Sequence, residues 1–230
     1  MKALSRNLSF VVLALAAGAA AAAELELEGS RLRVSGTLDG TALAGFKEHL
    51  ASGKVRTVMF ENSMGGSVNV AESYAAAIRA AGVRTEAIGQ CHAACAYAFL
   101  AGTEHRFGRG LNINALMIPV ASRPRSMDLV GRWQGIGAQK TLAEFTPTAT
   151  AVSTSAAEGP LPAQLPPAAP DAAKPGENWQ PDHGVLFTST PTLFGRIYNT
   201  YYCDGTQGRD VSRCELLSDA DPYKLGVLTP

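Results

Sequence analysis

The sequence predicts an α/β fold built on a mostly parallel sheet. Strand-like and helix-like segments alternate from residue 24 to about residue 119, the strand-like segments are short and apolar, and the central ones lead through small-residue turns into helices. Neighbouring parallel strands need a crossover between them, usually a helix. We therefore expect the first half of the chain to form helices packed on a sheet.

The individual elements follow from local periodicity and turn residues. Residues 24–27 and 31–35 alternate polar and apolar side chains, as half-buried strands do, and Gly29 and Ser30 between them predict a turn. The same patterns predict helices at residues 41–50, 68–81 and 93–101, and strands at residues 55–60, 84–88 and 111–118. Gly53 lies three residues after the first helix and Gly82 directly follows the second, and glycine is typical of helix C-termini.

Two turns in this region have the composition of a binding or catalytic site. The first reads Asn62-Ser63-Met64-Gly65-Gly66-Ser67, and the second reads Cys91-His92-Ala93-Ala94-Cys95. Because each turn joins a strand to a helix, two helix N-termini and their free N–H groups meet at one edge of the sheet. Donors arranged in this way stabilise a developing oxyanion.

These motifs resemble those of the Clp protease proteolytic subunit, within the wider Clp/crotonase superfamily, and are most similar to its secreted, cysteine-containing branch. The family's first turn reads N-S-P-G-G-S, and its second reads C-x-S-A-C around the nucleophilic serine. Here Met64 replaces the proline and Ala93 replaces the serine. The flanking segments 77–82 and 99–102 also match, so the resemblance covers about residues 31–119. It implies a Clp/crotonase-like repeated β-β-α spiral with a mostly parallel sheet.

The resemblance also implies that catalytic parts are missing. In the family a histidine at the end of the next strand activates the serine, and the matching segment here runs from Leu116 to Ile118 without a histidine. The chain's four histidines are His49, His92, His105 and His183. No family catalytic residue is therefore intact, and the resemblance implies a pseudoenzyme without serine peptidase activity that binds a peptide or protein partner.

Backbone donors survive the loss of a side chain, and alternative nucleophiles remain open. By the resemblance, the backbone of an oxyanion hole lies at Gly66, Ser67 and Ala94. A hydrolase with a displaced nucleophile would use Cys95 or Ser67, with His92 as its partner. Ser67 also suits the N-cap of the helix that follows it. A third interpretation is an inactive subunit of a mixed Clp-like assembly.

Four cysteines in a chain expected to be exported predict two disulfides. Local pairing of Cys91 with Cys95, and of Cys203 with Cys214, is the simplest of the three possible pairings. An alternative metal set consists of Cys91, His92, Cys95 and His105. This spacing matches no established zinc pattern, so we expect no metal ligands and no cofactor.

The chain divides into four predicted parts. Residues 1–23 read as a signal peptide, with a basic start, an apolar run and an Ala-x-Ala cleavage pattern. Residues 24–145 form the Clp/crotonase-like α/β core. Residues 146–183 contain eight prolines and nine alanines and predict a disordered insert. Residues 184–230 predict a small disulfide-containing β appendage.

Charge and targeting limit the classes of partner. Without the predicted signal peptide, 18 basic residues face 20 acidic ones, which gives no indication of a nucleic-acid partner. We expect a secreted or periplasmic protein that is not embedded in a membrane once the signal peptide is removed. A homo-oligomer remains possible, although the Pro/Ala-rich segment stands where Clp subunits continue into an assembly helix.

Overall fold

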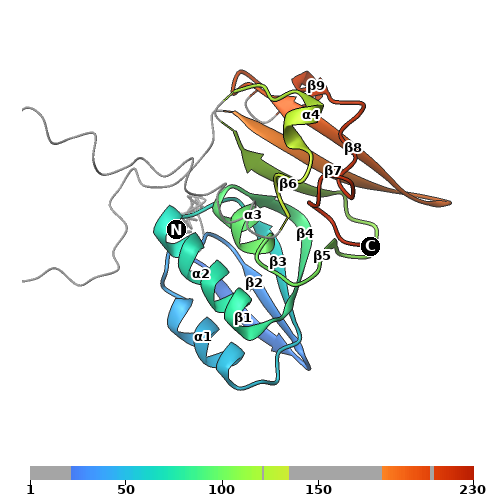
Figure 1. Cartoon of the computed structure of the whole chain (residues 1–230). Helices are drawn as coiled ribbons and strands as arrows, with labels where there is room; N and C mark the ends of the chain where they lie inside the picture. The colour runs from blue at the N-terminus through green and yellow to red at the C-terminus, as the bar shows by residue number, and fades with distance from the viewer. Residues whose placement is uncertain (1–21, 121, 135–182, 208–209) are drawn as a thin grey trace, which may run out of the picture.

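The computed structural model describes residues 22–120, 122–134, 183–207 and 210–230 (Figure 1). The predicted signal peptide and Pro/Ala-rich insert lie almost wholly outside these residues. The described elements, in chain order, are β1 (Glu24–Glu28), β2 (Arg31–Ser35), α1 (Leu43–Ala51), β3 (Thr57–Ser63), α2 (Val68–Ala81), β4 (Arg84–His92), α3 (Ala94–Phe99), β5 (His105–Phe107), β6 (Asn114–Pro119), α4 (Ser126–Leu129), β7 (Gly184–Thr192), β8 (Gly195–Cys203), the 3-10 helix η2 (Val211–Arg213) and β9 (Glu215–Leu216).

One mixed sheet contains all the described strands and confirms the predicted α/β class. Its order is β1-β2-β3-β4-β6-β7-β8-β9, with β5 paired to β4. The central pairs β2–β3, β3–β4 and β4–β6 are parallel, whereas β7 to β9 are antiparallel. The predicted C-terminal β appendage is therefore a set of antiparallel strands that continues the main sheet through the β6–β7 pairing.

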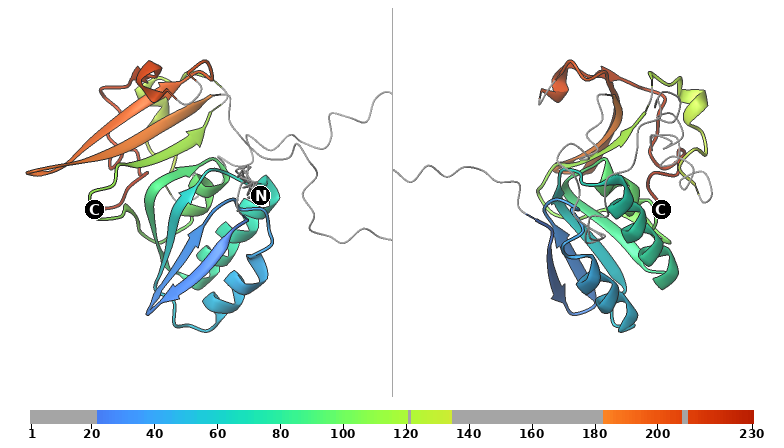
Figure 2. Two further views of the ribbon diagram at one scale, coloured as in Figure 1. Left: turned by 180° about the vertical axis from the view of Figure 1, so that it is seen from behind. Right: turned by 90° about the vertical axis from the view of Figure 1, so that its left-hand side faces the viewer.

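The helices α1, α2 and α3 lie together on one face of the parallel part of the sheet (Figures 1 and 2). Strand residues such as Val34 and Phe60 are fully buried there, together with Phe46, Tyr74 and Ile78 of the helices. Apolar burial of this kind supplies most of the driving force for folding. The opposite face carries ion pairs, which Arg31, Arg33, Glu26, Glu28, Glu61 and Glu86 form.

The predicted boundaries differ from the observed ones mainly at the two turns. The helix predicted at residues 68–81 begins and ends as predicted. Strand β3 continues to Ser63 and β4 continues to His92, because Ser63 pairs with Cys91 after an irregularity in the register. Pairing therefore extends into the motif residues and holds the two turns next to each other.

Within the described residues, no helix is both long enough and apolar enough to cross a membrane.

Candidate functional site

The two motif turns lie side by side at the carboxyl ends of the neighbouring parallel strands β3 and β4. The first turn is fixed by Leu38, whose N–H donates to the Gly65 carbonyl oxygen at 3.0 Å. The Ser67 N–H in turn donates to the Leu38 carbonyl oxygen at 3.1 Å. A Cβ at Gly66, where φ is +148°, would lie 2.2 Å from that same oxygen. Only glycine fits this approach.

Ala93 has a backbone conformation that alanine rarely adopts. Its φ is 50° and its ψ is −107°, and its side chain is only 1% exposed. Its N–H donates to the Met117 carbonyl oxygen at 2.9 Å, and its own carbonyl accepts from the Tyr97 N–H at 3.0 Å. Such a conformation costs about 1–3 kcal/mol at a non-glycine residue. Surrounding structure therefore holds the turn at this angle between β4 and α3.

A disulfide spans this turn. Cys91 and Cys95 are bonded, their Cα atoms are 5.2 Å apart, and both residues are fully buried. The second disulfide joins Cys203 to Cys214, so the local pairing is confirmed. Because Cys95 is bonded in this way, it provides no thiolate for the displaced-nucleophile hypothesis.

The segment that matches the family's histidine lies next to Ala93. It belongs to β6, where Met117 pairs with His92 and both Leu116 and Ile118 are buried. The structure thus brings this strand to the second turn, with methionine as its central residue. The histidines His105 and His183 have other partners, the Val227 carbonyl and the Tyr202 hydroxyl.

The three predicted oxyanion-hole positions differ in their backbone N–H groups. The Ser67 N–H is used by Leu38, whereas the N–H groups of Gly66 and Ala94 have no acceptor within the described residues. These two amides are unpaired in the described structure, and both residues are buried. Ser67 occupies the N-cap position of α2, but its side chain makes no capping hydrogen bond, so that part of the prediction is wrong.

Two polar side chains near the turns have atoms without a hydrogen-bond partner in the described structure. The Oγ of Ser63 and the Nε2 of His92 are both enclosed and unpaired. Burial lowers the pKa of His92 to about 4, although the residue as a whole keeps partial exposure. The ring is therefore neutral at pH 7. Within the described residues, no hydrogen bond joins His92 to Ser63, Ser67 or any other nucleophile.

An asparagine network that we did not predict shapes the strand ends beneath the turns. The Gly89 N–H donates to Asn114 Oδ1 at 3.0 Å, and Asn114 Nδ2 donates to the Gly108 carbonyl at 2.9 Å. A Cβ at Gly89 would lie 2.1 Å from the Oδ1 of Asn62, which has a φ of 49°. The available sequence signal was Asn114, a polar residue within a segment predicted as an apolar strand.

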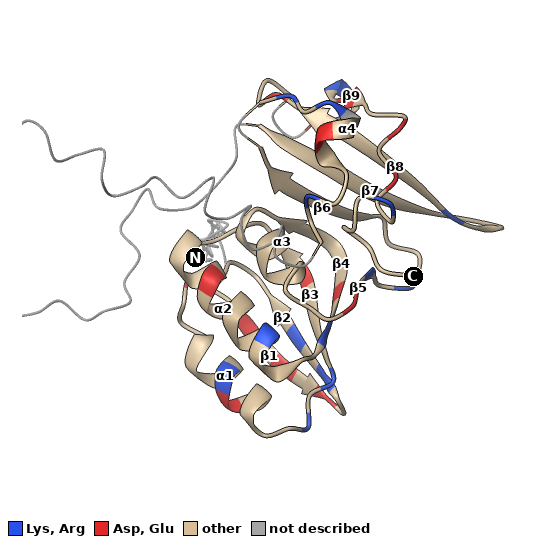
Figure 3. Cartoon of the chain, in the orientation of Figure 1, with Lys and Arg blue, Asp and Glu red and all other residues tan. Residues whose placement is uncertain are grey.

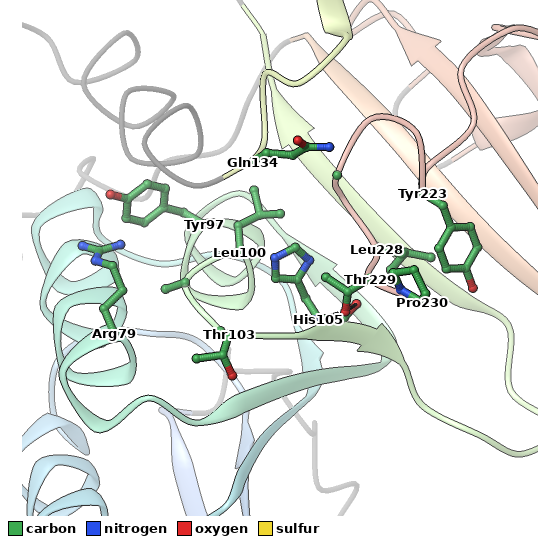
Figure 4. A pocket seen from close by; sticks show the side chains of 13 residues that line it. Arg79, Tyr97, Leu100, Thr103, His105, Gln134, Tyr223, Leu228, Thr229 and Pro230 are labelled. Atoms are coloured by element: carbon green, nitrogen blue, oxygen red, sulfur yellow. Dashed lines mark hydrogen bonds between the residues drawn. The ribbon is translucent and has the colours of Figure 1, made fainter.

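A separate cavity of about 440 Å³ lies between α2, α3, β5 and the segment of residues 223–230 (Figure 4). Arg79 and Tyr97 line one side of it, and Tyr223 and Leu228 line the other. Within the described residues, the guanidinium of Arg79 has no hydrogen-bond or ion-pair partner. None of the motif residues Gly66, Ser67, Ala93 and Ala94 lines this cavity.

The metal alternative is not assembled in the described structure. Two of its four members are joined as a disulfide, and the described residues contain no group of three or more potential ligands.

Family models and curated proteins give no match to the chain. Solved structures match parts of it. A probable enoyl-CoA hydratase/isomerase from Mycobacterium abscessus is 11% identical over 42% of this chain and 48% of its own, with a TM-score of 0.31. A membrane-bound stomatin-specific protease is 12% identical over 40% and 49%, with a TM-score of 0.32. An enoyl-CoA hydratase/carnithine racemase from Magnetospirillum magneticum is 13% identical over 54% and 61%, with a TM-score of 0.32.

The chain therefore spans about half the length of the first two structures. At these TM-scores the likeness carries no argument about function, which has to come from the two turns themselves.

Proposed function

We propose that this chain is an exported, Clp-protease-like member of the Clp/crotonase superfamily that lacks serine peptidase activity and binds an extended segment of a peptide or partner protein at its two turns. The observation that carries the proposal is Ala93. This residue has a positive φ in the turn between β4 and α3, and the Cys91–Cys95 disulfide spans that turn. The methyl side chain of Ala93 has no group that can attack a carbonyl.

The free backbone amides support a binding role. The N–H groups of Gly66 and Ala94 lie in the adjacent turns and have no acceptor among the described residues. Peptide carbonyls and carboxylates are the acceptors that such donors satisfy, and an extended peptide presents a carbonyl at every residue. Because the neutral, partly exposed His92 has no nucleophile hydrogen-bonded to it in the described structure, the same donors would hold a ligand without cleaving it.

Nuclear magnetic resonance of protein labelled with ¹⁵N-glycine and ¹⁵N-alanine tests this proposal. Titration with a pool of unstructured decapeptides should shift the amide signals of Gly66 and Ala94 in a saturable manner. The amide of Gly53, which donates to the Leu50 carbonyl in a distant turn, is the internal control. Saturable binding that leaves both turn amides unshifted would place the peptide site elsewhere and overturn the proposal.

A hydrolase with a displaced nucleophile is the second candidate, and the hydroxyl of Ser67 favours it. Among the described residues this hydroxyl makes no hydrogen bond, and Ser67 lies directly after the glycine pair. Incubation with a fluorophosphonate probe, followed by peptide mapping, distinguishes the candidates. Covalent labelling of Ser67 that is lost in Ser67→Ala would establish the hydrolase, whereas an unlabelled protein supports the binding role.

Export and assembly are separate parts of the proposal. Protein recovered from the periplasm or medium should begin near residue 24, and its N-terminus can be read by mass spectrometry. A native mass measurement distinguishes a single chain from a subunit of a mixed ring.

A further inference from the structure

An exposed apolar tip ends the hairpin formed by β7 and β8. Leu193 and Phe194 form the two-residue loop between these strands and are 96% and 99% exposed. Two-residue hairpin loops ordinarily contain glycine, asparagine or aspartate, which suit the turn and face water. A leucine and a phenylalanine at this position leave two large apolar side chains in solvent without a local structural need.

A second apolar segment lies against the hairpin. Leu111 is 91% exposed and Ile113 is 59% exposed, in the loop between β5 and β6. Arg196 of β8 holds this loop, because its guanidinium donates to the carbonyl oxygens of Gly110 at 2.9 Å and Asn112 at 2.7 Å. We call the exposed apolar residues of both segments the hairpin tip: Leu111, Ile113, Leu193, Phe194 and Ile197.

The two chain segments that carry the hairpin tip contain only positively charged residues. Residues 107–120 contain Arg109 as their single charged residue, and residues 184–203 contain Arg196 as theirs. Figure 3 shows the hairpin of β7 and β8 almost entirely in tan, with little blue or red. Among the described residues, neither arginine forms an ion pair with a carboxylate. Apolar side chains beside arginines that no described carboxylate neutralises complement an anionic lipid surface, because the apolar groups enter the acyl boundary and the positive charge favours phosphates. Arg109 is the exposed arginine that can contact a phosphate, whereas the guanidinium of Arg196 donates to backbone carbonyls and contributes only its charge.

The shape of the hairpin agrees with this occupant. In Figures 1 and 2 the hairpin extends well beyond the rest of the molecule, so its end is convex and reaches a flat surface before other elements do. A convex apolar tip fits a partner that is either concave or deformable, and a bilayer deforms around it without a matching groove. We propose that the hairpin tip inserts into the interface of bilayers containing anionic phospholipids and anchors the protein reversibly at a membrane surface.

Vesicle sedimentation tests the proposal. Protein recovered after export is used, because the apolar run at residues 8–15 would itself bind lipid, and all variants are compared with the same N-terminus. Wild-type protein should sediment with phosphatidylglycerol-containing vesicles, and less so with pure phosphatidylcholine or at 1 M salt, where charges are screened. The double variant Leu193→Ser/Phe194→Ser should partition roughly tenfold more weakly, since two large apolar side chains no longer leave water.

The matched control is Met127→Ser/Val130→Ser, which removes two other apolar side chains that are 80% and 70% exposed, at α4. It should bind like wild type. A fluorescence readout adds the depth of insertion: Phe194→Trp should gain a blue-shifted emission component with vesicles that the wild-type spectrum lacks.

Three results would overturn the proposal. Wild-type protein that fails to sediment with anionic vesicles excludes the membrane surface. Equal loss of binding in the α4 control shows that general hydrophobicity is responsible. A native mass that falls from dimer to monomer in the Leu193→Ser/Phe194→Ser variant shows that the hairpin tip is instead an interface between copies of this chain.

Discussion

Replacing Ala93 by glycine tests whether the second turn stores backbone strain. At φ 50° and ψ −107°, alanine costs about 1–3 kcal/mol that glycine largely avoids. Two effects of the substitution oppose this gain. The buried methyl group is lost, which costs about 0.8 kcal/mol, and the greater conformational freedom of glycine in the unfolded chain costs about 0.5–1 kcal/mol. The net change for Ala93→Gly therefore lies between a loss of about 1 kcal/mol and a gain of about 2 kcal/mol.

Ala96→Gly is the matched control because Ala96 is also fully buried and lies in α3 with ordinary helical geometry. It loses the methyl burial and about 1 kcal/mol of helix propensity without relief of strain, about 2 kcal/mol in all. Ala93→Gly should therefore be about 1–3 kcal/mol the less destabilising of the two. Guanidinium denaturation measures the free energy of unfolding of both variants, and the comparison requires that their m-values are equal. If both variants lost the same stability, Ala93 would not be strained, and the argument for a retained turn geometry would fail.

Three further predictions concern the surroundings of the turns. Cys91→Ala/Cys95→Ala should lower the free energy of unfolding by about 2 kcal/mol, the loop-entropy value for a short loop, and an unchanged thermal midpoint would contradict it. Asn114→Ala should cost about 2 kcal/mol in a denaturation experiment, since it leaves two backbone groups without their partner. His92 has a folded-state pKa of about 4, below that of the unfolded chain, so the unfolded state binds more protons between about pH 6.5 and pH 4. The free energy of unfolding should therefore fall by roughly 2–3 kcal/mol as the pH is lowered from about 6.5 to about 4. His92→Gln should remove most of this dependence when denaturation is measured at a series of pH values.

The parallel half of the fold could be predicted because its signals are local. The helix at residues 68–81 is bounded by Ser67 and Gly82, residues typical of helix ends, and its boundaries are those observed. The same holds for the disulfides, since short sequence separations made local pairing the simplest choice.

The parts that sequence did not predict depend on contacts across strands. The extension of β3 to Ser63 exists because Ser63 pairs with Cys91 of β4, and neither residue alone indicates that pairing. The continuation of the main sheet into β7 depends on strand β6, more than sixty residues earlier in the chain. The backbone angles of Ala93 and the use of the Ser67 N–H by Leu38 are likewise tertiary properties. Sequence could therefore identify the residues of the site but not which of its amides are free.

Peptide hydrolysis by the purified, oxidised protein tests the central claim most directly, namely that the turn at Ala93 has been kept for binding without catalysis. With a pool of internally quenched fluorogenic peptides, wild-type protein should show no turnover above a protein-free blank. Ala93→Ser should show none either, because the segment Leu116–Ile118, where the resemblance expects the base, contains no histidine. Saturable turnover by the wild type that Ser67→Ala abolishes, while the fold stays intact, would contradict the account.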